Sequence, residues 1–234
     1  MTTEQALDRR WKYPAVPSIV RREIQRPDRG IVRALANHPV NDVADIVGGL
    51  YTARDLRPLY SPMAAVAGPS LTVRCPPGDN LGVKLALEMV QPGDVLVVDA
   101  QGFDSWCLGG FQMLARAIRE RGLAGLIVHG AYRDSLEARE AGFPIYATAQ
   151  SARSGPKIGP FEINVPACCG GVIVQPGDIA CASEDGVAFV PRAHADAVVD
   201  RLTAPPPAKP PQAANAYAAY LQGLRDAGLV DEQD

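Results

Sequence analysis

Short apolar runs alternate with helix-spaced apolar positions through the middle of the chain. The runs VLVV (95–98) and GLIV (125–128) and the segment 144–149 have the continuous apolar character of strands that are buried on both faces. Apolar residues at helical spacing between them predict helices over 109–121 and roughly 134–141. Alternation of strands and helices favours parallel strand pairing, so we expect an α/β sheet here.

The preceding part of the chain continues this alternation. Residues 64–75 predict a strand, and NLGVKLALEMV (80–90) predicts a helix that is capped by Asp79 or Asn80. Residues 31–50 also have near-helical apolar spacing. There we expect a short helix that begins at Asn41 or Asp42 and ends at Gly48-Gly49.

The second half of the chain has a different pattern, with glycines and prolines between short β-prone segments. These segments predict hairpins or antiparallel strands, and they are FEINVP (161–166), GGVIV (170–174), DIACA (178–182) and GVAFV (186–190). QPGD occurs twice, at 91–94 and 175–178, each time before an apolar strand. Proline at the second position and glycine at the third predict a type II turn in both copies.

The two ends of the chain differ from this core. Residues 1–30 are polar and rich in arginine and proline, which indicates an N-terminal arm. Residues 203–212 (TAPPPAKPPQ) predict an extended, stiff linker. The segment 214–229 predicts an amphipathic helix that packs on a neighbouring surface or subunit. We therefore divide the chain into 1–30, 31–202 and 203–234.

Composition excludes several classes of protein. Hydrophobic residues make up 47% and charged residues 21% of the 234 residues, with a formal net charge of −3 and no obvious basic stripe, so we expect no nucleic-acid partner. No apolar run is long enough to span a membrane, and the polar start of the chain does not resemble a secretory signal. The five cysteines are an odd number without C-x-x-C spacing, which favours small core residues and a cytoplasmic location.

Gly109-Gly110 precedes the helix predicted over 109–121. A helix N-terminus presents unpaired backbone N–H groups and a positive dipole end, where a carboxylate or phosphate can bind. The alternative is a strand-to-helix turn that needs the glycines only for its backbone geometry, and Gly-Gly before a helix is by itself a weak signal. No G-x-G-x-x-G sequence and no P-loop lysine is present, so this segment does not predict nucleotide binding.

The segment LIVHGAYRDS (126–135) places a cation and a carboxylate side by side just past a strand that we expect to end near Gly130. In a parallel sheet, ligands bind beyond the carboxyl ends of the strands, where Gly109-Gly110 is also expected. Arg133 can hold a carboxylate with two parallel hydrogen bonds, and Asp134 can hold a hard divalent ion. The alternative is a surface ion pair in which Asp134 caps the next helix. His129 is either a buried neutral imidazole or a residue of the site.

Several ordered motifs resemble the RraA-like family, which includes class II pyruvate aldolases. They cover roughly residues 35–200 and include GDN, PGDVLVVD, the R-D pair, NVP, the second PGD and DGV. The resemblance implies a swivelling β/β/α fold, in which a parallel sheet and an antiparallel sheet are flanked by helices. It also implies a homotrimer or a dimer of trimers with sites between subunits.

The resemblance further implies roles for individual residues. Arg133 matches the substrate-binding arginine of the family, and Asp134 matches its ligand for Mg²⁺ or Mn²⁺. The pyruvate-binding segment of the family falls on Phe111, Gln112, Met113 and Leu114. The implied reaction cleaves a 4-hydroxy-2-oxo acid, such as 4-hydroxy-4-methyl-2-oxoglutarate or 4-carboxy-4-hydroxy-2-oxoadipate, to pyruvate and a second oxo acid. Decarboxylation of oxaloacetate passes through the same pyruvate enolate and is the expected side activity.

The chain departs from the family pattern at two positions. Phe111-Gln112 stands where the aldolases often have glycine and an acid, and His129 stands where they often have an acid before Gly130. Gln112 cannot accept a proton at neutral pH, whereas the pKa of a histidine lies near it, which makes His129 a candidate acid or base. Two other hypotheses for the function stay open. One is a decarboxylase or another lyase for a different oxo acid, and the other is a non-catalytic RraA-like regulator of a ribonuclease.

Overall fold

The computed structural model describes residues 15–205 and 213–228. The chain forms two compact units, Met1–Leu202 and Thr203–Asp234. Within the second unit, the helix α8 (Ala213–Asp226) confirms the helix predicted near the end of the chain. Residues 1–14 of the predicted arm and most of the proline-rich linker lie outside the described residues. No helix in the described ranges is long and apolar enough to cross a membrane.

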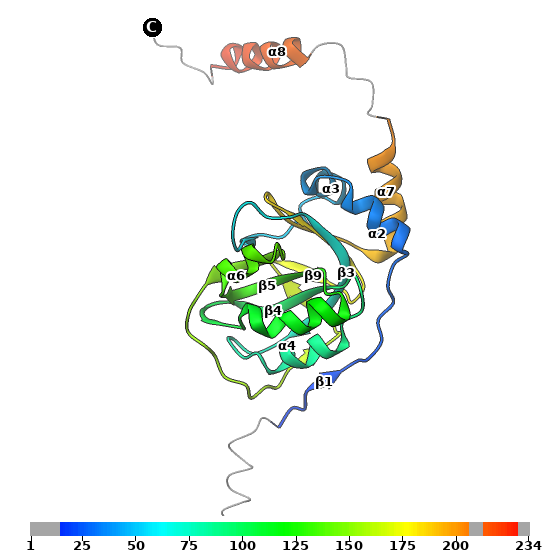
Figure 1. The fold of residues 1–234 in the computed structure, drawn as a ribbon. Helices are drawn as coiled ribbons and strands as arrows, with labels where there is room; N and C mark the ends of the chain where they lie inside the picture. Colours follow the sequence, from blue (N-terminus) through cyan, green and yellow to red (C-terminus); the bar gives the residue numbers. More distant parts are fainter. Residues whose placement is uncertain (1–14, 206–212, 229–234) are drawn as a thin grey trace, which may run out of the picture. The chain divides into compact units, whose positions relative to one another are not determined.

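Four strands form the parallel centre of the first unit (Figure 1). β3 (Val66–Arg74), β4 (Val95–Cys107), β5 (Gly125–Tyr132) and β6 (Ile145–Gln150) lie next to one another in this order, and each pair is parallel. Their central residues are fully buried, as the continuous apolar runs predicted. The predicted parallel α/β sheet is confirmed.

The helices between these strands also follow the sequence pattern. They are α4 (Leu81–Ala86) with the 3₁₀ turn η1 (Leu87–Met89), α5 (Phe111–Arg116) with the π-helical turn η2 (Ala117–Arg121), and α6 (Ser135–Glu140). Asp79 accepts a hydrogen bond from Leu81 N at 2.9 Å, which confirms the predicted cap. Gly122 ends η2 in the left-handed conformation, where glycine has no steric penalty.

Two strands run further than their apolar runs. β5 continues past Gly130 to Tyr132, so the predicted end near Gly130 is wrong by two residues. β4 continues from its buried apolar run through residues 101–106 (QGFDSW), where its pairing with β5 has two irregularities. Pairing of Phe103 with Gly130 and of Cys107 with Ala131 keeps this stretch in the sheet, although most of its side chains are partly exposed.

Short strands complete the edges of this sheet. β7 (Glu162–Ile163) pairs antiparallel with β3 and parallel with β1 (Ile19–Val20), so residues 19–20 of the predicted arm join the sheet. β2 (Arg57–Pro58) pairs antiparallel with β6 at the other edge.

A second layer contains the antiparallel strands that were predicted for the second half of the chain. β10 (Ile179–Ser183) pairs with β11 (Gly186–Val190) and with the first residues of β3. β8 (Ala167–Cys169) and β9 (Val172–Val174) form a separate two-stranded sheet. β3 therefore belongs to both layers, because its first half pairs with β10 and its second half with β4.

Three helices gather on β10 and β11 at one end of the unit (Figure 1). They are α2 (Arg29–Ala36), α3 (Val40–Val47) and α7 (Ala195–Thr203), which follows the 3₁₀ turn η3 (Arg192–His194). Their apolar faces enclose a second hydrophobic core around Leu35, Val43 and Val198. The prediction that Asn41 or Asp42 begins α3 is wrong. The helix begins at Val40 after Pro39, because proline fixes the backbone before the first turn, and it ends at Gly48 as predicted.

Both QPGD segments form the predicted turns. The third residue has a positive φ in each, 94° at Gly93 and 89° at Gly177, and the Asp N–H donates to the Gln carbonyl at 3.0 Å. Each Asp side chain also accepts a hydrogen bond from the N–H of the Gln at 2.9 Å. All five cysteines are free thiols, and four of them are buried.

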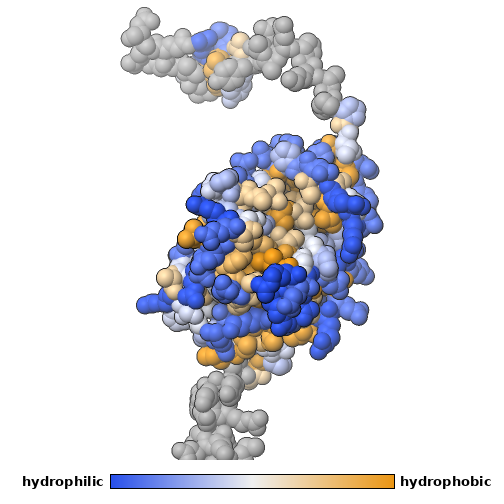
Figure 2. All heavy atoms as spheres, viewed as in Figure 1, coloured by the Kyte–Doolittle hydropathy of each residue, from blue (hydrophilic) through white to orange (hydrophobic). Residues whose placement is uncertain are grey.

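On the face shown in Figure 2, hydrophilic residues surround a central area of hydrophobic ones.

Candidate functional site

The carboxyl ends of β4 and β5 bring two loops together. Cys107 pairs with Ala131, and Leu108 N donates a hydrogen bond to the Ala131 carbonyl at 2.9 Å. The segment after β4 leads through Gly110 into α5, and the segment after β5 carries Arg133 and Asp134. The two loops therefore lie at the same end of the sheet, as the predicted parallel pairing required.

Asp134 links these two loops directly. Its Oδ2 atom accepts a hydrogen bond from Phe111 N, the first residue of α5, at 2.9 Å. Asp134 occupies the N-cap position of its own helix α6, but its side chain makes no capping bond there. The carboxylate thus caps a helix that begins 23 residues earlier in the chain. Neither interpretation of Asp134 from the sequence, as a metal ligand or as the cap of the next helix, anticipated this contact.

The backbone around Asp134 is shaped for this contact. Asp134 has φ 64° and ψ 45°, the left-handed region that Asp tolerates better than most residues. At Gly110 a Cβ atom would overlap Asp134 Oδ2, so glycine at this N-cap lets the carboxylate keep its place. The Tyr132 hydroxyl donates to the Gly110 carbonyl at 3.0 Å. Burial, followed by the charge of Asp134, raises the pKa of Tyr132 well above its ordinary value, so the hydroxyl keeps its proton.

Arg133 lines a pocket together with Asp134. Its Nη1 donates to the Ala152 carbonyl at 3.0 Å, and its Nε lies 3.8 Å from Asp134 Oδ1. The pocket has a volume of about 440 Å³ and is lined by Arg133, Asp134, Gln150, Ser151 and Ala152. Side-chain exposures of 41% for Arg133 and 30% for Asp134 leave both groups accessible to a small molecule. The predicted surface ion pair exists, and it faces a pocket.

Gln150, Ser151 and Ala152 are pocket residues that no sequence pattern indicated. They follow β6, the next parallel strand of the sheet, so the rule that located Arg133 applies to them as well. Hydrogen bonds to neighbouring segments hold Gln150 and Ser151 in place. Gln150 Nε2 donates to the Leu59 carbonyl at 2.8 Å, and Ser151 Oγ donates to the Ser105 carbonyl at 2.7 Å.

The predicted pyruvate-binding segment 111–114 lies next to Asp134, and its side chains have different environments. The Phe111 ring packs edge-on against Phe143 with a centroid distance of 6.2 Å, and Leu114 is fully buried. Gln112 is exposed, and Met113 is half-buried. Phe111 N is bonded to Asp134 and Met113 N to the Gly110 carbonyl. Within the described residues no protein group accepts a hydrogen bond from Gln112 N, so this N–H can bind an anion.

His129 is not brought to the pocket that contains Arg133 and Asp134. It lies four residues before Arg133, a distance of about 13 Å along an extended strand. Its Nδ1 is 3.3 Å from the Cys168 carbonyl and 4.0 Å from Asp99 Oδ1. The half-buried imidazole therefore belongs to a different cluster.

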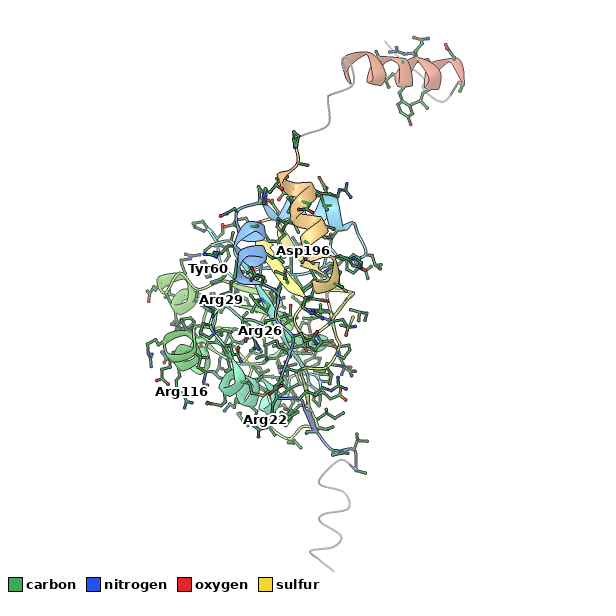
Figure 3. All side chains as sticks on the ribbon, turned by 90° about the vertical axis from the view of Figure 1, so that its right-hand side faces the viewer. Arg22, Arg26, Arg29, Tyr60, Arg116 and Asp196 are labelled. Carbon is green, nitrogen blue, oxygen red and sulfur yellow. The ribbon has the colours of Figure 1, made fainter. Side chains whose placement is uncertain are left out.

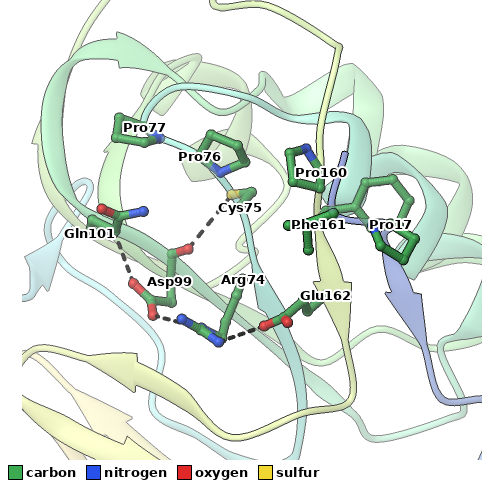
Figure 4. Close-up of a pocket in the computed structure, with 11 residues that line it drawn as sticks. Pro17, Arg74, Cys75, Pro76, Pro77, Asp99, Gln101, Pro160, Phe161 and Glu162 are labelled. Atoms are coloured by element: carbon green, nitrogen blue, oxygen red, sulfur yellow. Dashed lines mark hydrogen bonds and ion pairs between the residues drawn. The ribbon is translucent and has the colours of Figure 1, made fainter. Parts of the chain in front are cut away.

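That cluster surrounds Asp99, which is 6% exposed (Figure 4). Asp99 accepts hydrogen bonds from Gln101 N at 2.9 Å and from Cys168 N at 3.0 Å, and it lies 3.7 Å from Arg74 Nε. Arg74 also pairs with Glu162 at 2.5 Å. Since both Asp99 oxygens already have partners, the cluster is explained as a polar link between β3, β4, β7 and β8.

The donor atoms around Asp134 fit a hydrated divalent ion. Among the described residues, no three His, Cys, Asp or Glu side chains are close enough to form a metal cage. Asp134 Oδ2 accepts a hydrogen bond from Phe111 N. Among the described residues, the cation near Oδ1 is the Arg133 guanidinium at 3.8 Å, and Oδ1 faces the pocket that Asp134 lines. Mg²⁺ commonly binds to one or two carboxylates and keeps several waters, and this arrangement can supply such a site.

Comparison with known proteins now decides the family. The model of the RraA-like family, described as Aldolase/RraA, matches residues 40–189. This chain belongs to the RraA-like family.

Two relatives of this RraA-like protein carry aldolase names. A protein of Halalkalibacterium halodurans named as a putative 4-hydroxy-4-methyl-2-oxoglutarate aldolase is 35% identical over 163 residues, which is 70% of this chain and 77% of the relative. The 4-hydroxy-4-methyl-2-oxoglutarate aldolase of Thermus thermophilus is 41% identical over 114 residues, which is 48% of this chain and 68% of the relative.

A solved structure confirms the fold of this RraA-like protein. RraAS2 of Streptomyces coelicolor, described as an unusual member of the RNase ES inhibitor RraA protein family, has a TM-score of 0.66 and 30% identity. The match covers 87% of this chain and 99% of RraAS2. The predicted RraA-like architecture, with a mixed parallel and antiparallel sheet, a small antiparallel sheet and flanking helices, is therefore correct.

Proposed function

We propose that this chain is a divalent-metal-dependent aldolase. Its substrate would be a 4-hydroxy-2-oxo acid such as 4-hydroxy-4-methyl-2-oxoglutarate or 4-carboxy-4-hydroxy-2-oxoadipate, and its products would be pyruvate and a second oxo acid. The observation that carries the proposal is the Arg133–Asp134 pair, which lines a pocket beside the N-terminus of α5. The aldolase names of two relatives support the same reaction class.

In this proposal Arg133 binds the 2-oxo acid end of the substrate. The Ala152 carbonyl and the Asp134 carboxylate orient the guanidinium, which reduces the entropy lost when it engages a ligand. As the bond between the third and fourth carbons breaks, negative charge develops on the oxygen of the pyruvate enolate. A fixed cation stabilises that charge more than it stabilises the neutral carbonyl, which lowers the barrier.

Asp134 is the residue that would hold the Mg²⁺ or Mn²⁺ ion, with water as the other ligands. When bound, such an ion would act as a Lewis acid and would lower the charge that builds up on the substrate as the bond breaks. The hydrogen bond from Phe111 N keeps the carboxylate in place. The free Gln112 N–H at the start of α5 would bind a carboxylate oxygen of the substrate.

The proton of the 4-hydroxyl group needs an acceptor. Of the five residues that line the pocket, Gln150 and Ser151 are neutral and cannot accept a proton near pH 7. His129 lies in the Asp99 cluster, so we give it no role in the proton transfer. We assign this proton to water in the pocket. Decarboxylation of oxaloacetate requires no such base and would be a side activity at the same site.

Assembly into a homotrimer or a dimer of trimers, with sites between subunits, is part of the same proposal. The single chain leaves Arg133 and Asp134 partly exposed, which leaves room for a neighbouring subunit to cover the pocket.

Pyruvate release tests the proposal. The chain is incubated with the two 4-hydroxy-2-oxo acids and with oxaloacetate, and pyruvate is coupled to lactate dehydrogenase, with Mg²⁺ or with EDTA. We expect release from at least one 4-hydroxy-2-oxo acid, dependent on Mg²⁺. Pyruvate from oxaloacetate alone would indicate a decarboxylase. If none of the three released pyruvate, the aldolase proposal would fail and a role in regulating a ribonuclease, as the name of RraAS2 describes for its family, would be the alternative.

Two substitutions assign the chemistry to the pocket. Arg133→Lys keeps the charge but removes the planar fork, so we expect kcat to fall by about 10-fold or more. His129→Asn is the matched control on the same strand, with an expected change in kcat of no more than about twofold. Equal loss of kcat in both variants would contradict the assignment.

A further inference from the structure

A second cavity lies at the end of the parallel sheet where β3 and β4 begin, opposite the end that carries Arg133. It has a volume of about 540 Å³, between the N-terminal segment, α2 and the turn before β4. Gln91, Pro92 and Gly93 form the side that precedes β4, and the first residues of β3 form another side. Since β3 and β4 begin at this edge and the proposed catalytic pocket follows their carboxyl ends, the two cavities are distinct.

All charged residues that line this cavity are arginines. They are Arg26, Arg29 and Arg33, and no Asp or Glu is among the lining residues. The pocket around Arg74, in contrast, is also lined by Asp99 and Glu162. A lining that contains cations only is unexpected for a chain with a net charge of −3, and it attracts anions.

Arg26 has a structural role in the wall of the cavity. Its Nε and Nη2 each donate to an Asp94 carboxylate oxygen at 2.8 Å, and the Asp94 side chain is completely buried. This two-pronged pair fixes the N-terminal segment against the turn before β4. It also uses the charge of Arg26, so ligand binding depends on the other two arginines.

Arg29 and Arg33 lie one turn apart on the same face of α2 and are both exposed. Like charges at this spacing repel each other. Throughout the described ranges, neither guanidinium has an acidic partner within ion-pair distance. Asp28, just before α2, accepts a hydrogen bond from Gly30 N at 2.6 Å as the helix cap. A ligand with two negative charges would relieve the repulsion between the two arginines.

The remaining wall of the cavity is largely apolar. Val32, Ala67, Pro69 and Pro92 provide surfaces against which a hydrocarbon or ring can pack. The volume is within the usual range for small-molecule sites, about 300–1,000 Å³. Figure 3 shows Arg22, Arg26 and Arg29 one above another on the face turned to the viewer, following the N-terminal segment toward α2.

We propose that this cavity is a second small-molecule site, and that it binds an organic phosphate monoester. Arg29 and Arg33 would bind the phosphate, whose charge of about −1.5 to −2 at pH 7 matches two guanidinium groups. The apolar wall would contact the organic part of the ligand. The proposal does not depend on the aldolase reaction.

Isothermal titration calorimetry with four probes tests the proposal. The probes are phenyl phosphate, inorganic phosphate, phenol and phenylacetate, which separate the contributions of the dianion, the ring and a single negative charge. We expect phenyl phosphate to bind one site per chain and more tightly than the other three. Tighter binding of phenylacetate than of phenyl phosphate, or of phenol alone, would overturn the assignment to phosphate monoesters.

A matched pair of variants locates the binding. Arg29→Gln with Arg33→Gln removes the two proposed ligands, and we expect the affinity for phenyl phosphate to fall by about 10-fold or more. Arg119→Gln with Arg201→Gln removes the same net charge from exposed positions outside the cavity, and it should leave the affinity unchanged. Binding that survives the first double substitution, or that weakens equally in both, would overturn the proposal.

Discussion

Asp134 Oδ2 accepts a hydrogen bond from Phe111 N at 2.9 Å, although the two residues are 23 positions apart. The bond joins the loop after β5 to the first turn of α5. It brings the predicted metal ligand and the predicted pyruvate-binding segment into direct contact. The function that we propose depends on this contact, since it fixes the carboxylate beside the guanidinium of Arg133.

Gly110→Ala tests the space that this contact requires. A Cβ atom at residue 110 would overlap Asp134 Oδ2, so the carboxylate must move. We expect pyruvate release to fall by about 100-fold, because small displacements of a catalytic group are costly, and stability to fall by about 1–3 kcal/mol. Gly49→Ala is the control, because no atom lies within 4 Å of a Cβ there. Urea denaturation and the coupled pyruvate assay measure the two effects, and wild-type activity in Gly110→Ala would refute the packing argument.

Arg26→Ala should destabilise the fold. It leaves the fully buried Asp94 carboxylate without its bidentate partner. Removing one partner of a buried ion pair typically costs about 3–5 kcal/mol, and urea denaturation would measure the loss. Arg22→Ala, four residues earlier and exposed, is expected to change stability by no more than about 0.5 kcal/mol. Similar unfolding midpoints for the two variants would show that the Arg26–Asp94 pair does not anchor the segment.

The native chain should react with a thiol reagent at a single cysteine. Cys168 is half-buried, whereas the other four thiols are buried. Burial raises the pKa of Cys181 to about 12, and burial raises the pKa of Cys75 and Cys169 as well, so these thiols stay protonated near pH 8. We expect Ellman's reagent to titrate about one thiol per native chain and five after unfolding. Cys168→Ser should remove the fast reaction, and rapid reaction of a second thiol would contradict the burial pattern.

Much of the sheet could be predicted from the sequence because its signals are local. The runs VLVV and GLIV gave β4 and β5, and QPGD gave both turns. The second half of β4 could not be predicted, because it stays in the sheet through its pairing with β5 and has no continuous apolar run. The start of α3 was wrong because the fixed backbone of Pro39 outweighed the capping preference of Asn41 and Asp42.

The candidate site could be predicted only where one general rule applied, namely that ligands bind beyond the carboxyl ends of parallel strands. Arg133 and Asp134 follow a buried strand of a parallel sheet, and so do Gln150 and Ser151, which the sequence analysis passed over. The bond from Phe111 to Asp134 and the separation of His129 depend on the register of β4 and β5, which no local pattern encodes. The arginine cavity also depends on tertiary structure, because α2 meets the turn at Gln91 only in the folded chain.

Asp134→Asn separates the two roles of this residue. Asparagine keeps an oxygen that can accept from Phe111 N and tolerates the left-handed backbone, so we expect the melting temperature to change by no more than about 2 °C. Asp134→Ala loses the hydrogen bond as well and should lower stability by about 1–3 kcal/mol.

The most direct measurement is the rate at which folded Asp134→Asn releases pyruvate from 4-hydroxy-4-methyl-2-oxoglutarate in the presence of Mg²⁺. Loss of the carboxylate charge should reduce this rate by about 100-fold or more relative to the unsubstituted chain, although the fold is intact. Release at the rate of the unsubstituted chain would contradict the assignment of Asp134 as the metal-binding residue of a pyruvate aldolase.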